Sequence, residues 1–420
     1  MFLIYQFIIS IIILISPIIL LVRIFKNKED KKRFVEKFCY FSKKRGNGKL
    51  IWFHGSSVGE ILSIIPLIKN LEKNNSIQKI LITSSTLSSS FVLKKFKLRK
   101  TVHQFFPIDL IFFTKIFLNY WRPSIAIFIE SEIWPSMFLE LNKKSIPLLL
   151  MNARITNKTY KKWSKINLFS ENIFNKINIA YPQNKETHNY LKKLKVNNIK
   201  SIGNLKFTEN KKNIENFFNK KLIERFNNRK IWCASSTHPN EEFDCAQVHI
   251  KLKKKYNNLL TIIIPRHIHR ANEIKSKIQN LKLNIVNHSS NIKKLNNVDI
   301  YLVDTYGETE KFYKISKTVF LGGSLIKHGG QNPIEAARLG STIISGPNID
   351  NFKEVYQLFY DKKIAYKAKN INELAKLVDK SFKNSINNKK YSKINKMGTK
   401  ILTIASNEIN NLLKNEIKKT

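Results

Sequence analysis

The first residues of the chain form an unbroken apolar run. Residues 1–22 carry no charged side chain, which at about 1.5 Å per residue is enough helix to cross a bilayer core. Basic residues follow at once between Arg23 and Arg33. The positive-inside rule therefore predicts a membrane anchor over 1–24, with the N-terminus outside and the rest in the cytoplasm. A cleaved signal peptide is the alternative, but its basic start and small-residue cleavage site are missing.

Beyond the anchor, short apolar runs alternate with longer segments of helical period. Buried strands are predicted at 50–53, 80–83, 125–129, 148–151, 177–181 and 200–202, and again at 231–234, 260–264, 300–303, 319–321, 342–344 and 364–366. Between the first two strands, apolar residues from Ile61 to Leu71 fall on one helical face. This rhythm predicts an α/β protein whose parallel sheets carry helices on both faces.

The two series of strands predict two domains. A polar stretch, 208–220, separates them and is the expected boundary. We expect an N-terminal domain over 34–207 and a C-terminal domain over 221–395. The Lys/Asn-rich tail from about residue 384 is predicted to be helical and solvated, with 396–420 as a separate C-terminal helix.

Composition adds a strong positive charge. The net charge of +44 over 420 residues favours anionic partners, namely nucleic acid, acidic phospholipid or phosphorylated substrates. Because the lysines are spread throughout a chain also rich in Asn and Ile, compositional drift is the alternative explanation. The three cysteines form no CxxC pair, which argues against a zinc site or a disulfide framework and fits a reducing compartment.

Polar residues gather where the predicted strands end, most densely between Val319 and Ala337. There a strand is followed by Gly322-Gly323, Gly329-Gly330 and a helix that opens near Asn332, with Pro333 expected at its first position. Glycines allow close backbone approach and a helix start favours anions, so this loop suits a phosphate, with Glu335 placed to accept hydrogen bonds from ribose hydroxyls. The alternative is that Asn332 and Glu335 only cap the helix.

The ends of other strands supply charged groups. Arg266 follows one strand of the second series, and Glu60 follows the first strand of the chain on a glycine turn. Because ligands of open α/β sheets bind at the carboxyl ends of strands, we expect a cleft between the two domains. A carboxylate there can take the proton of an attacking hydroxyl while cations stabilise a departing phosphate. The alternative is that Glu60 is an ordinary first-turn acid. No DxD triplet is present, so no metal is expected.

The motifs at these strand ends occur in a recognisable order. They are His54-Gly-Ser-Ser-Val-Gly-Glu60, Glu130-Ser-Glu-Ile-Trp-Pro135, Asn152-Ala-Arg154, Gly203-Asn-Leu-Lys-Phe207, Ser236-Thr-His238, Pro265-Arg-His267, Asp304-Thr-Tyr-Gly-Glu308 and Gly322-Gly-Ser…Gly-Gly-Gln-Asn-Pro-Ile-Glu335. This series resembles that of the 3-deoxy-D-manno-octulosonic acid (Kdo) transferases of Gram-negative bacteria, from the anchor to about residue 352. The chain departs from the family pattern at Gln331 (usually His), at 268–270 (usually Pro-Glu-Arg) and within Gly55-Ser56-Ser57 (usually with Ala-Ala).

The resemblance implies a GT-B glycosyltransferase with two Rossmann-like domains, the acceptor on the first and the nucleotide sugar on the second. It implies an inverting transfer of Kdo from CMP-Kdo to the lipid A precursor (lipid IVA) at the cytoplasmic face of the inner membrane, without a cofactor. Glu60 would be the base, and Glu130 and Lys206 would stabilise the transition state. The CMP contacts implied are Pro265, Arg266, Tyr306, Gly307, Glu308, Asn332, Pro333, Ile334 and Glu335.

Partners and rival functions follow from the same residues. Juxtamembrane lysines and arginines favour an anionic inner-membrane surface. One rival is another membrane-associated GT-B enzyme that uses a UDP-sugar. The other is a membrane-tethered nucleic-acid-binding protein, which should show a recognition module or aromatics interleaved with basic residues, and neither is found. No nucleic-acid partner is therefore expected.

Overall fold

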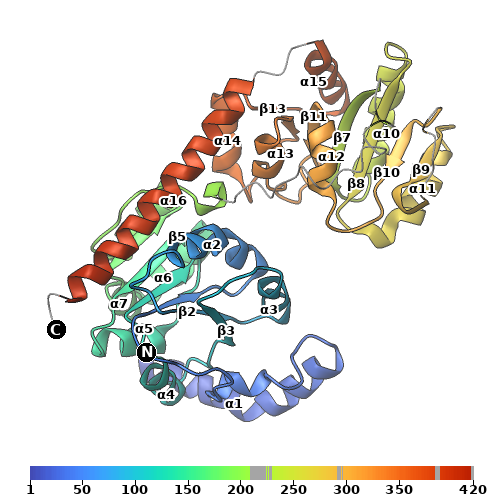
Figure 1. The fold of residues 1–420 in the computed structure, drawn as a ribbon. Helices are drawn as coiled ribbons and strands as arrows, with labels where there is room; N and C mark the ends of the chain where they lie inside the picture. Colours follow the sequence, from blue (N-terminus) through green and yellow to red (C-terminus); the bar gives the residue numbers. More distant parts are fainter. Residues whose placement is uncertain are drawn as a thin grey trace. The chain divides into compact units, whose positions relative to one another are not determined.

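The computed structural model describes residues 1–208, 224, 226, 229–290, 295, 297–383 and 388–417. The chain forms two compact units, one made of Met1–Asn210 with Met397–Thr420 and the other of Lys211–Lys396. The boundary predicted at 208–220 falls outside the described residues apart from Thr208. Each unit is built on one parallel sheet with helices on its faces (Figure 1).

The first unit holds a six-stranded parallel sheet in the order β3-β2-β1-β4-β5-β6. Its strands are β1 Leu50–His54, β2 Lys79–Ser84, β3 Thr101–Phe105, β4 Ile125–Ile129, β5 Leu148–Ala153 and β6 Ile179–Pro182. Its helices are α1 Phe2–Phe25, α2 Val58–Leu71, α3 Leu87–Lys94, α4 Ile111–Trp121, α5 Pro135–Lys143, α6 Asn157–Ser164, α7 Asn167–Phe174 and α8 Lys185–Lys193, with 3-10 turns η1 Phe34–Phe38 and η2 Leu205–Thr208. Strands β1 and β4 are buried at every position, as expected for the centre of a sheet covered on both faces.

The second unit holds a seven-stranded parallel sheet in the order β13-β12-β11-β7-β8-β10-β9. Its strands are β7 Lys230–Thr237, β8 Leu259–Pro265, β9 Ile285–Asn287, β10 Ile300–Leu302, β11 Thr318–Leu321, β12 Thr342–Ser345 and β13 Ala365–Lys367. Its helices are α10 Glu241–Lys253, α11 Ala271–Gln279, α12 Thr309–Ile315, α13 Ile334–Arg338, α14 Lys353–Asp361 and α15 Ile371–Lys383, with 3-10 turns η4 Ile268–Arg270 and η5 His288–Ser290. Strand β7 at the centre joins β8 on one side and β11 on the other.

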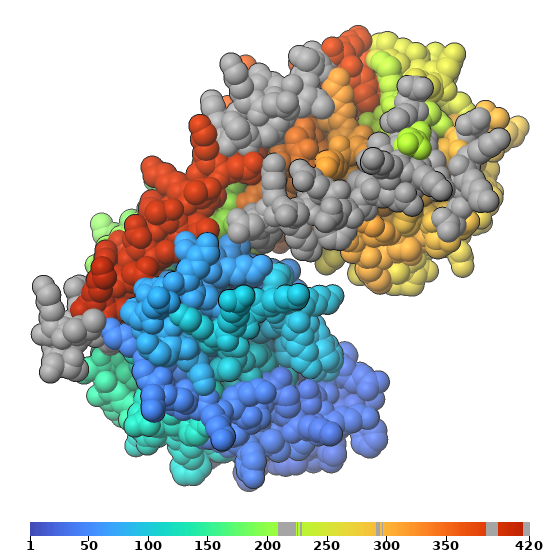
Figure 2. All heavy atoms as spheres, viewed as in Figure 1, coloured from blue at the N-terminus to red at the C-terminus, as the bar shows by residue number. Residues whose placement is uncertain are grey.

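Helix α16, Asn388–Ile417, corrects one prediction. The tail is helical as expected, but it is not wholly solvated, because from Met397 on it belongs to the first unit. Ile401, Ile409 and Leu413 are buried, and Glu408 accepts hydrogen bonds from Tyr181 and Lys200. From Met397 on, the helix lies along the first unit (Figure 2). Its apolar residues recur about every four positions among many Lys and Asn residues. One face of this helix can therefore pack against the first unit.

All but one of the predicted strands are confirmed, and two further strands were missed. Residues 200–202 form no strand, and only an isolated bridge between Ala180 and Ile199 extends the sheet there. Strands β3 and β9 were not predicted. Both lie at an edge of their sheet and are partly exposed, so neither shows the continuous apolar run of a central strand.

Helix α1 is the one helix in the described part of the chain that is long and apolar enough to cross a membrane. Its first turn is nevertheless held on the first unit, because the hydroxyl of Tyr5 donates to Asp109 (2.7 Å) and the amide of Gln6 donates to Ser136 (2.6 Å). The single-pass crossing of the membrane by α1 stays a prediction. These two hydrogen bonds bear on it because they hold the start of the helix on the first unit.

Candidate active site

Glu60 lies in the first turn of α2, directly after the carboxyl end of β1. One carboxylate oxygen accepts the backbone N–H of Ser56 (2.7 Å) and the other accepts the hydroxyl of Ser57 (2.8 Å), while Ser57 in turn caps the helix. Burial and then the nearby Glu132 and Glu130 raise the pKa of Glu60 to about 7, although its two hydrogen bonds oppose the shift. A carboxylate poised near neutrality is suited to taking a proton from a hydroxyl.

Glu132 is the second carboxylate of this site, and it is fixed by the aromatic core of the unit. The buried His54 contacts it through Nε2 at 3.0 Å, and Trp134 Nε1 donates to the same oxygen at 2.9 Å. Burial acts to raise the pKa of Glu132, but these hydrogen bonds outweigh burial and hold it below its ordinary value. Glu132 is therefore an anion beside Glu60, and after burial it is the next cause that makes Glu60 hard to ionise.

Glu130 directly follows β4 and forms an ion pair with Lys206, which lies within η2, with 2.8 Å between Nζ and Oε1. Asn152, at the end of β5, donates to Glu130 through its amide nitrogen and accepts the backbone N–H of Leu205 through its oxygen. Both Glu130 (φ 55°) and Asn152 (φ 53°) adopt left-handed backbone conformations, which are unfavourable for residues other than glycine. The surrounding packing holds this strain, as is frequent at functional sites.

The glycine loop after β11 is organised around one carboxylate of the second unit. Glu241, at the first position of α10, accepts the backbone N–H groups of His238, Gly323, Ser324 and Leu325 at 2.6–3.1 Å. Burial raises the pKa of Glu241, and the four backbone donors oppose this. A Cβ on Gly322 would lie 2.6 Å from the carbonyl oxygen of Ser236, so the loop and the end of β7 fit only without a side chain there.

Basic groups surround the mouth of this loop. The ring of His238 lies over that of His328, with centroids 3.9 Å apart, and His267 lies nearby. Burial and then the neighbouring His328 and His267 lower the pKa of His238 to about 4, with Arg266 contributing. Arg266 itself is exposed and is placed by its backbone N–H, which donates to the carbonyl of Thr237. The exposed guanidinium of Arg266 is the cationic group that an anion would meet here.

The remaining donor-site candidates lie on two further loops of the same sheet. After β10, Tyr306 is 74% exposed and Gly307 has φ 83°, while Glu308 pairs with His288 (2.8 Å) and Lys311 (2.6 Å). These bonds outweigh burial and lower the pKa of Glu308. The stretch of Asn332, Pro333, Ile334 and Glu335 starts α13, with Asn332 accepting the N–H of Ile334 (3.1 Å) and Glu335 in the first turn.

One detail of that helix start differs from the sequence prediction. Pro333 is the residue before the helix rather than its first member, and α13 is only five residues long. Asn332 therefore forms a local turn at the entry. Because the residue at the helix cap is Pro333 and no side chain caps the helix, the alternative in which Asn332 caps α13 is not confirmed. The phosphate site there stays a prediction.

The structure thus brings the predicted residues into two groups, one in each unit. Glu60, Glu130 and Lys206 gather at the carboxyl edge of the first sheet, and Pro265 with Arg266, Tyr306 to Glu308 and Asn332 to Glu335 lie at the carboxyl edge of the second. Sequence reasoning gave no role to Glu132, His54, Asn152, His238 or Glu241. The role of Glu241 could have been predicted from the sequence. An acidic residue at a helix start, directly after the loop that ends a strand, is suited to accept hydrogen bonds from backbone N–H groups.

Comparison with known proteins identifies the family. A 3-deoxy-D-manno-octulosonic acid transferase of Rickettsia bellii is 33% identical over 375 residues, which is 89% of both chains. The chain belongs to the 3-deoxy-D-manno-octulosonic acid (Kdo) transferase family.

Other comparisons agree with membership of the Kdo transferase family. The transferase of Haemophilus influenzae is 28% identical over 348 residues, or 80% of both chains. The family model described as 3-deoxy-D-manno-octulosonic-acid transferase matches residues 32–209. A glycosyltransferase structure from Rickettsia africae has a TM-score of 0.58 at 15% identity and covers 89% of this chain and all (100%) of its own. That likeness shows the fold, and the predicted GT-B architecture is confirmed.

Family membership makes the chain a glycosyltransferase that transfers Kdo in lipopolysaccharide biosynthesis, as the motifs predicted. The arrangement in the first unit suits this chemistry. It offers a carboxylate with a pKa near neutrality as a base and a lysine paired with a second carboxylate as an electrostatic partner.

Proposed function

We propose that this Kdo transferase takes Kdo from CMP-Kdo and transfers it with inversion to a hydroxyl of the lipid A precursor, lipid IVA. Glu60 removes the proton of the acceptor hydroxyl as its oxygen bonds to the anomeric carbon of Kdo. The bond from that carbon to the phosphate oxygen breaks, and CMP leaves with the electron pair. The observation that carries the proposal is the placing of Glu60 after β1, where Ser56 and Ser57 hold its oxygens. Burial and then Glu132 and Glu130 raise its pKa to about 7, which allows both uptake and release of a proton.

The other site residues receive roles in the same proposal. Glu130 and Lys206 stabilise the charge that develops in the transition state, because their ion pair lies just beyond the end of β4, where Glu130 is close enough to Glu60 to affect its ionisation. The CMP group is bound by Pro265 and Arg266, by Tyr306 to Glu308 and by Asn332 to Glu335. CMP-Kdo is a substrate, so the proposal includes no cofactor.

We further propose that the enzyme works at the cytoplasmic face of the cell inner membrane, held there by α1. Lipid A precursors carry phosphates at that surface, and the basic residues after α1 favour anionic lipid. A single pass through the bilayer is one way for α1 to attach the enzyme, and lying within one leaflet is the other. Both leave the catalytic units in the cytoplasm.

An assay of the detergent-purified full chain tests the function. CMP should be released from CMP-Kdo only when lipid IVA is present, and the chain should show no length-dependent affinity for DNA or RNA. A UDP-sugar that outcompetes CMP-Kdo would overturn the donor, and acceptor-independent release of CMP would overturn the acceptor.

The variant Glu60→Gln tests the base. Since an amide cannot accept the proton, we expect turnover to fall by about 10²-fold or more, with CMP binding unchanged. Ser42→Ala, which alters a surface hydroxyl of the same unit that contacts Glu36, serves as the control and should keep its turnover. Unchanged turnover in Glu60→Gln would remove Glu60 from the mechanism.

A further inference from the structure

Helix α1 is less exposed on one side than on the other. The less exposed positions recur with helical period and form one stripe from the first turn to the last, namely Phe2, Tyr5, Gln6, Ile9, Ser10, Ile13, Ser16, Leu20, Arg23 and Ile24. Ser16, past the middle of the helix, is buried. If the helix projected away from the protein into a bilayer, its residues beyond the point of attachment would be equally exposed to lipid on all sides.

The start of α1 is attached by polar and aromatic contacts. Asp109, fully buried, accepts the Tyr5 hydroxyl as well as the backbone N–H groups of Ser136 and Met137. Gln6 donates to Ser136 and accepts the N–H of Ile111 at 3.0 Å. Burial raises the pKa of Asp109 to about 6, and these hydrogen bonds oppose the shift. The first turn is thus part of the polar network of α4 and α5.

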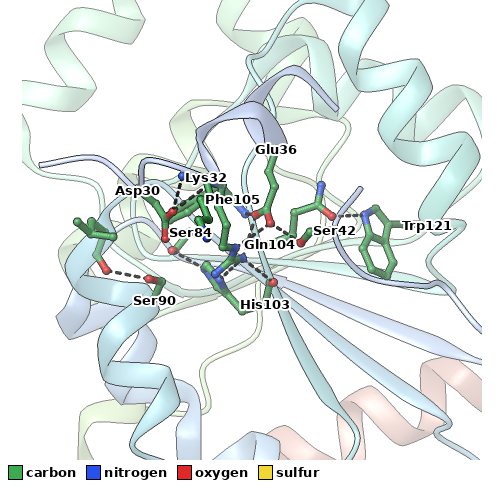
Figure 3. Close-up of polar contacts among 12 residues, drawn as sticks. Asp30, Lys32, Glu36, Ser42, Ser84, Ser90, His103, Gln104, Phe105 and Trp121 are labelled. Atoms are coloured by element: carbon green, nitrogen blue, oxygen red, sulfur yellow. Dashed lines mark hydrogen bonds and ion pairs between the residues drawn. The ribbon is translucent and has the colours of Figure 1, made fainter. Parts of the chain in front are cut away.

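The end of α1 is attached to the same unit at another place. Arg23 pairs with Glu29, whose carboxylate also binds Lys37 at 2.6 Å. The segment that follows is fixed to the edge strand β3, where the buried Glu36 accepts the backbone N–H of Phe105 and pairs with Arg33 at 2.8 Å (Figure 3). Arg33 also donates to the carbonyl of His103.

These attachments conflict with a crossing helix. The two ends of 24 helical residues lie about 36 Å apart, and both ends lie on one protein unit. A helix that crosses the hydrocarbon core must have its ends on opposite sides of it. In this structure, therefore, α1 runs along the unit, as Figure 1 also shows.

The outward face of α1 is apolar and continues onto neighbouring helices. Leu3 is 82% exposed, and exposed Ile, Leu, Phe and Val side chains follow as far as Phe25. Phe112 (62% exposed) follows Ile111, which binds Gln6, and Leu168 (86% exposed) precedes Phe169, which stacks on Phe2. Soluble proteins rarely expose a continuous apolar surface of this extent.

Basic side chains border this apolar surface. Lys26, Lys28, Lys31 and Lys32 are exposed after the end of α1. Lys115 stands one turn from Phe112 on α4, and Lys165 is exposed just before Leu168. An apolar face bordered by cations matches a leaflet whose acyl chains lie beneath anionic headgroups.

We propose that α1 is an in-plane membrane helix. It lies within the interface of one leaflet of an anionic bilayer, with Phe112 and Leu168 inserted beside it, and it does not cross the bilayer. The N-terminus then stays on the same side as the first unit, in contrast to the orientation that the positive-inside rule predicts. This inference does not depend on the identity of the donor or the acceptor.

Spin labels on the full chain test the orientation. The three native cysteines are buried, so single cysteines introduced at Leu3, Phe7, Leu14, Ile18 and Val22 can be labelled selectively. Vesicles of phosphatidylethanolamine and phosphatidylglycerol at three to one are the probe membrane. Depth, from the ratio of oxygen to nickel-complex accessibility, should stay at about 5–10 Å at all five positions. Labels at Ser10 and Ser16 lie on the inner face, so both oxygen and the nickel complex should have little access to them.

Other outcomes would overturn the proposal. A depth that is greatest near Leu14, at about 15 Å, and falls toward both ends would show a crossing helix. Labels shielded from lipid and broadened by mutual dipolar coupling would show a second copy of the chain on this face instead. Vesicles of phosphatidylcholine alone should bind the chain at least about tenfold more weakly, and equal binding would contradict the role of anionic headgroups.

Discussion

A carboxylate that acts as a base near neutral pH must be hard to ionise and yet held in place. Glu60 meets both conditions, because Ser56 and Ser57 orient its oxygens while burial and Glu132 disfavour its charge. The same position also suits an ordinary first-turn acid, since Ser57 caps α2 by accepting the backbone N–H of Glu60. The first-turn and the catalytic interpretations of Glu60 are thus compatible, and the sequence alone does not choose between them.

Removing the charge of Glu132 should shift the pH dependence of transfer. Glu60 must be deprotonated to act, so activity is lost as pH falls through its pKa of about 7. In Glu132→Gln a like charge disappears, the pKa of Glu60 falls, and the acidic limb of kcat/KM should move to lower pH. Burial, the larger cause of the raised pKa of Glu60, remains in this variant. The acidic limb should therefore stay at a higher pH than the limb of an exposed glutamate. A pH–rate profile measures this.

The matched variant Glu132→Asp keeps the charge and should leave the acidic limb close to its original position. An acidic limb that does not move in Glu132→Gln would mean that Glu132 does not control the ionisation of Glu60. A limb that moves equally in both variants would point to a change of packing around His54 and Trp134, which contact Glu132.

At the scale of elements, the sequence predicted central strands well and edges poorly. Strands β1 and β4 are continuous apolar runs and were predicted nearly to the residue, whereas β3, Thr101–Phe105, is only partly buried and was missed. The loops of the other motifs were placed correctly because they follow strands, whereas the motif at 203–207 follows no strand, since 200–202 form none. Contacts between loops were not predictable, because the partner of Gly323 is Glu241, 82 residues away, and nothing in local spacing indicates that pair.

The variant Glu241→Gln should loosen the glycine loop of the second unit. An amide keeps one acceptor oxygen but presents an N–H₂ group to backbone donors, so bonds to a charged group worth about 1.5–3 kcal/mol are lost. We expect CMP affinity to fall by about one to two powers of ten, measured by titration calorimetry. Asp244→Asn, on the same first turn of α10, should bind CMP as the wild type does. Undiminished affinity in Glu241→Gln would show that the loop does not need this support.

At the scale of the whole molecule, the chain leaves the first unit at Asn210 and returns to it at Met397. The second unit is therefore inserted in the first, and α16 completes the first unit from the far end of the sequence. Ile401 of α16 packs against Gly203, which lies on the turn that leads to Lys206. A Cβ on Gly203 would lie 2.8 Å from the Cδ1 atom of Ile401. The last helix thus supports the loop that carries a proposed catalytic residue.

Shortening Ile409 should destabilise the first unit selectively. The side chain is fully buried, and Ile→Ala typically costs about 2–5 kcal/mol. For a unit of this size, that corresponds to a fall in unfolding temperature on the order of 5–15 °C. In a Trp232→Phe background all the remaining tryptophans (Trp52, Trp121, Trp134 and Trp163) lie in the first unit, so their fluorescence reports on that unit alone. Lys414→Ala, at an exposed position of the same helix, should leave the transition unchanged. If Ile409→Ala left it unchanged too, α16 would not be an integral part of the first unit, and its contact with Gly203 would have no part in holding Lys206.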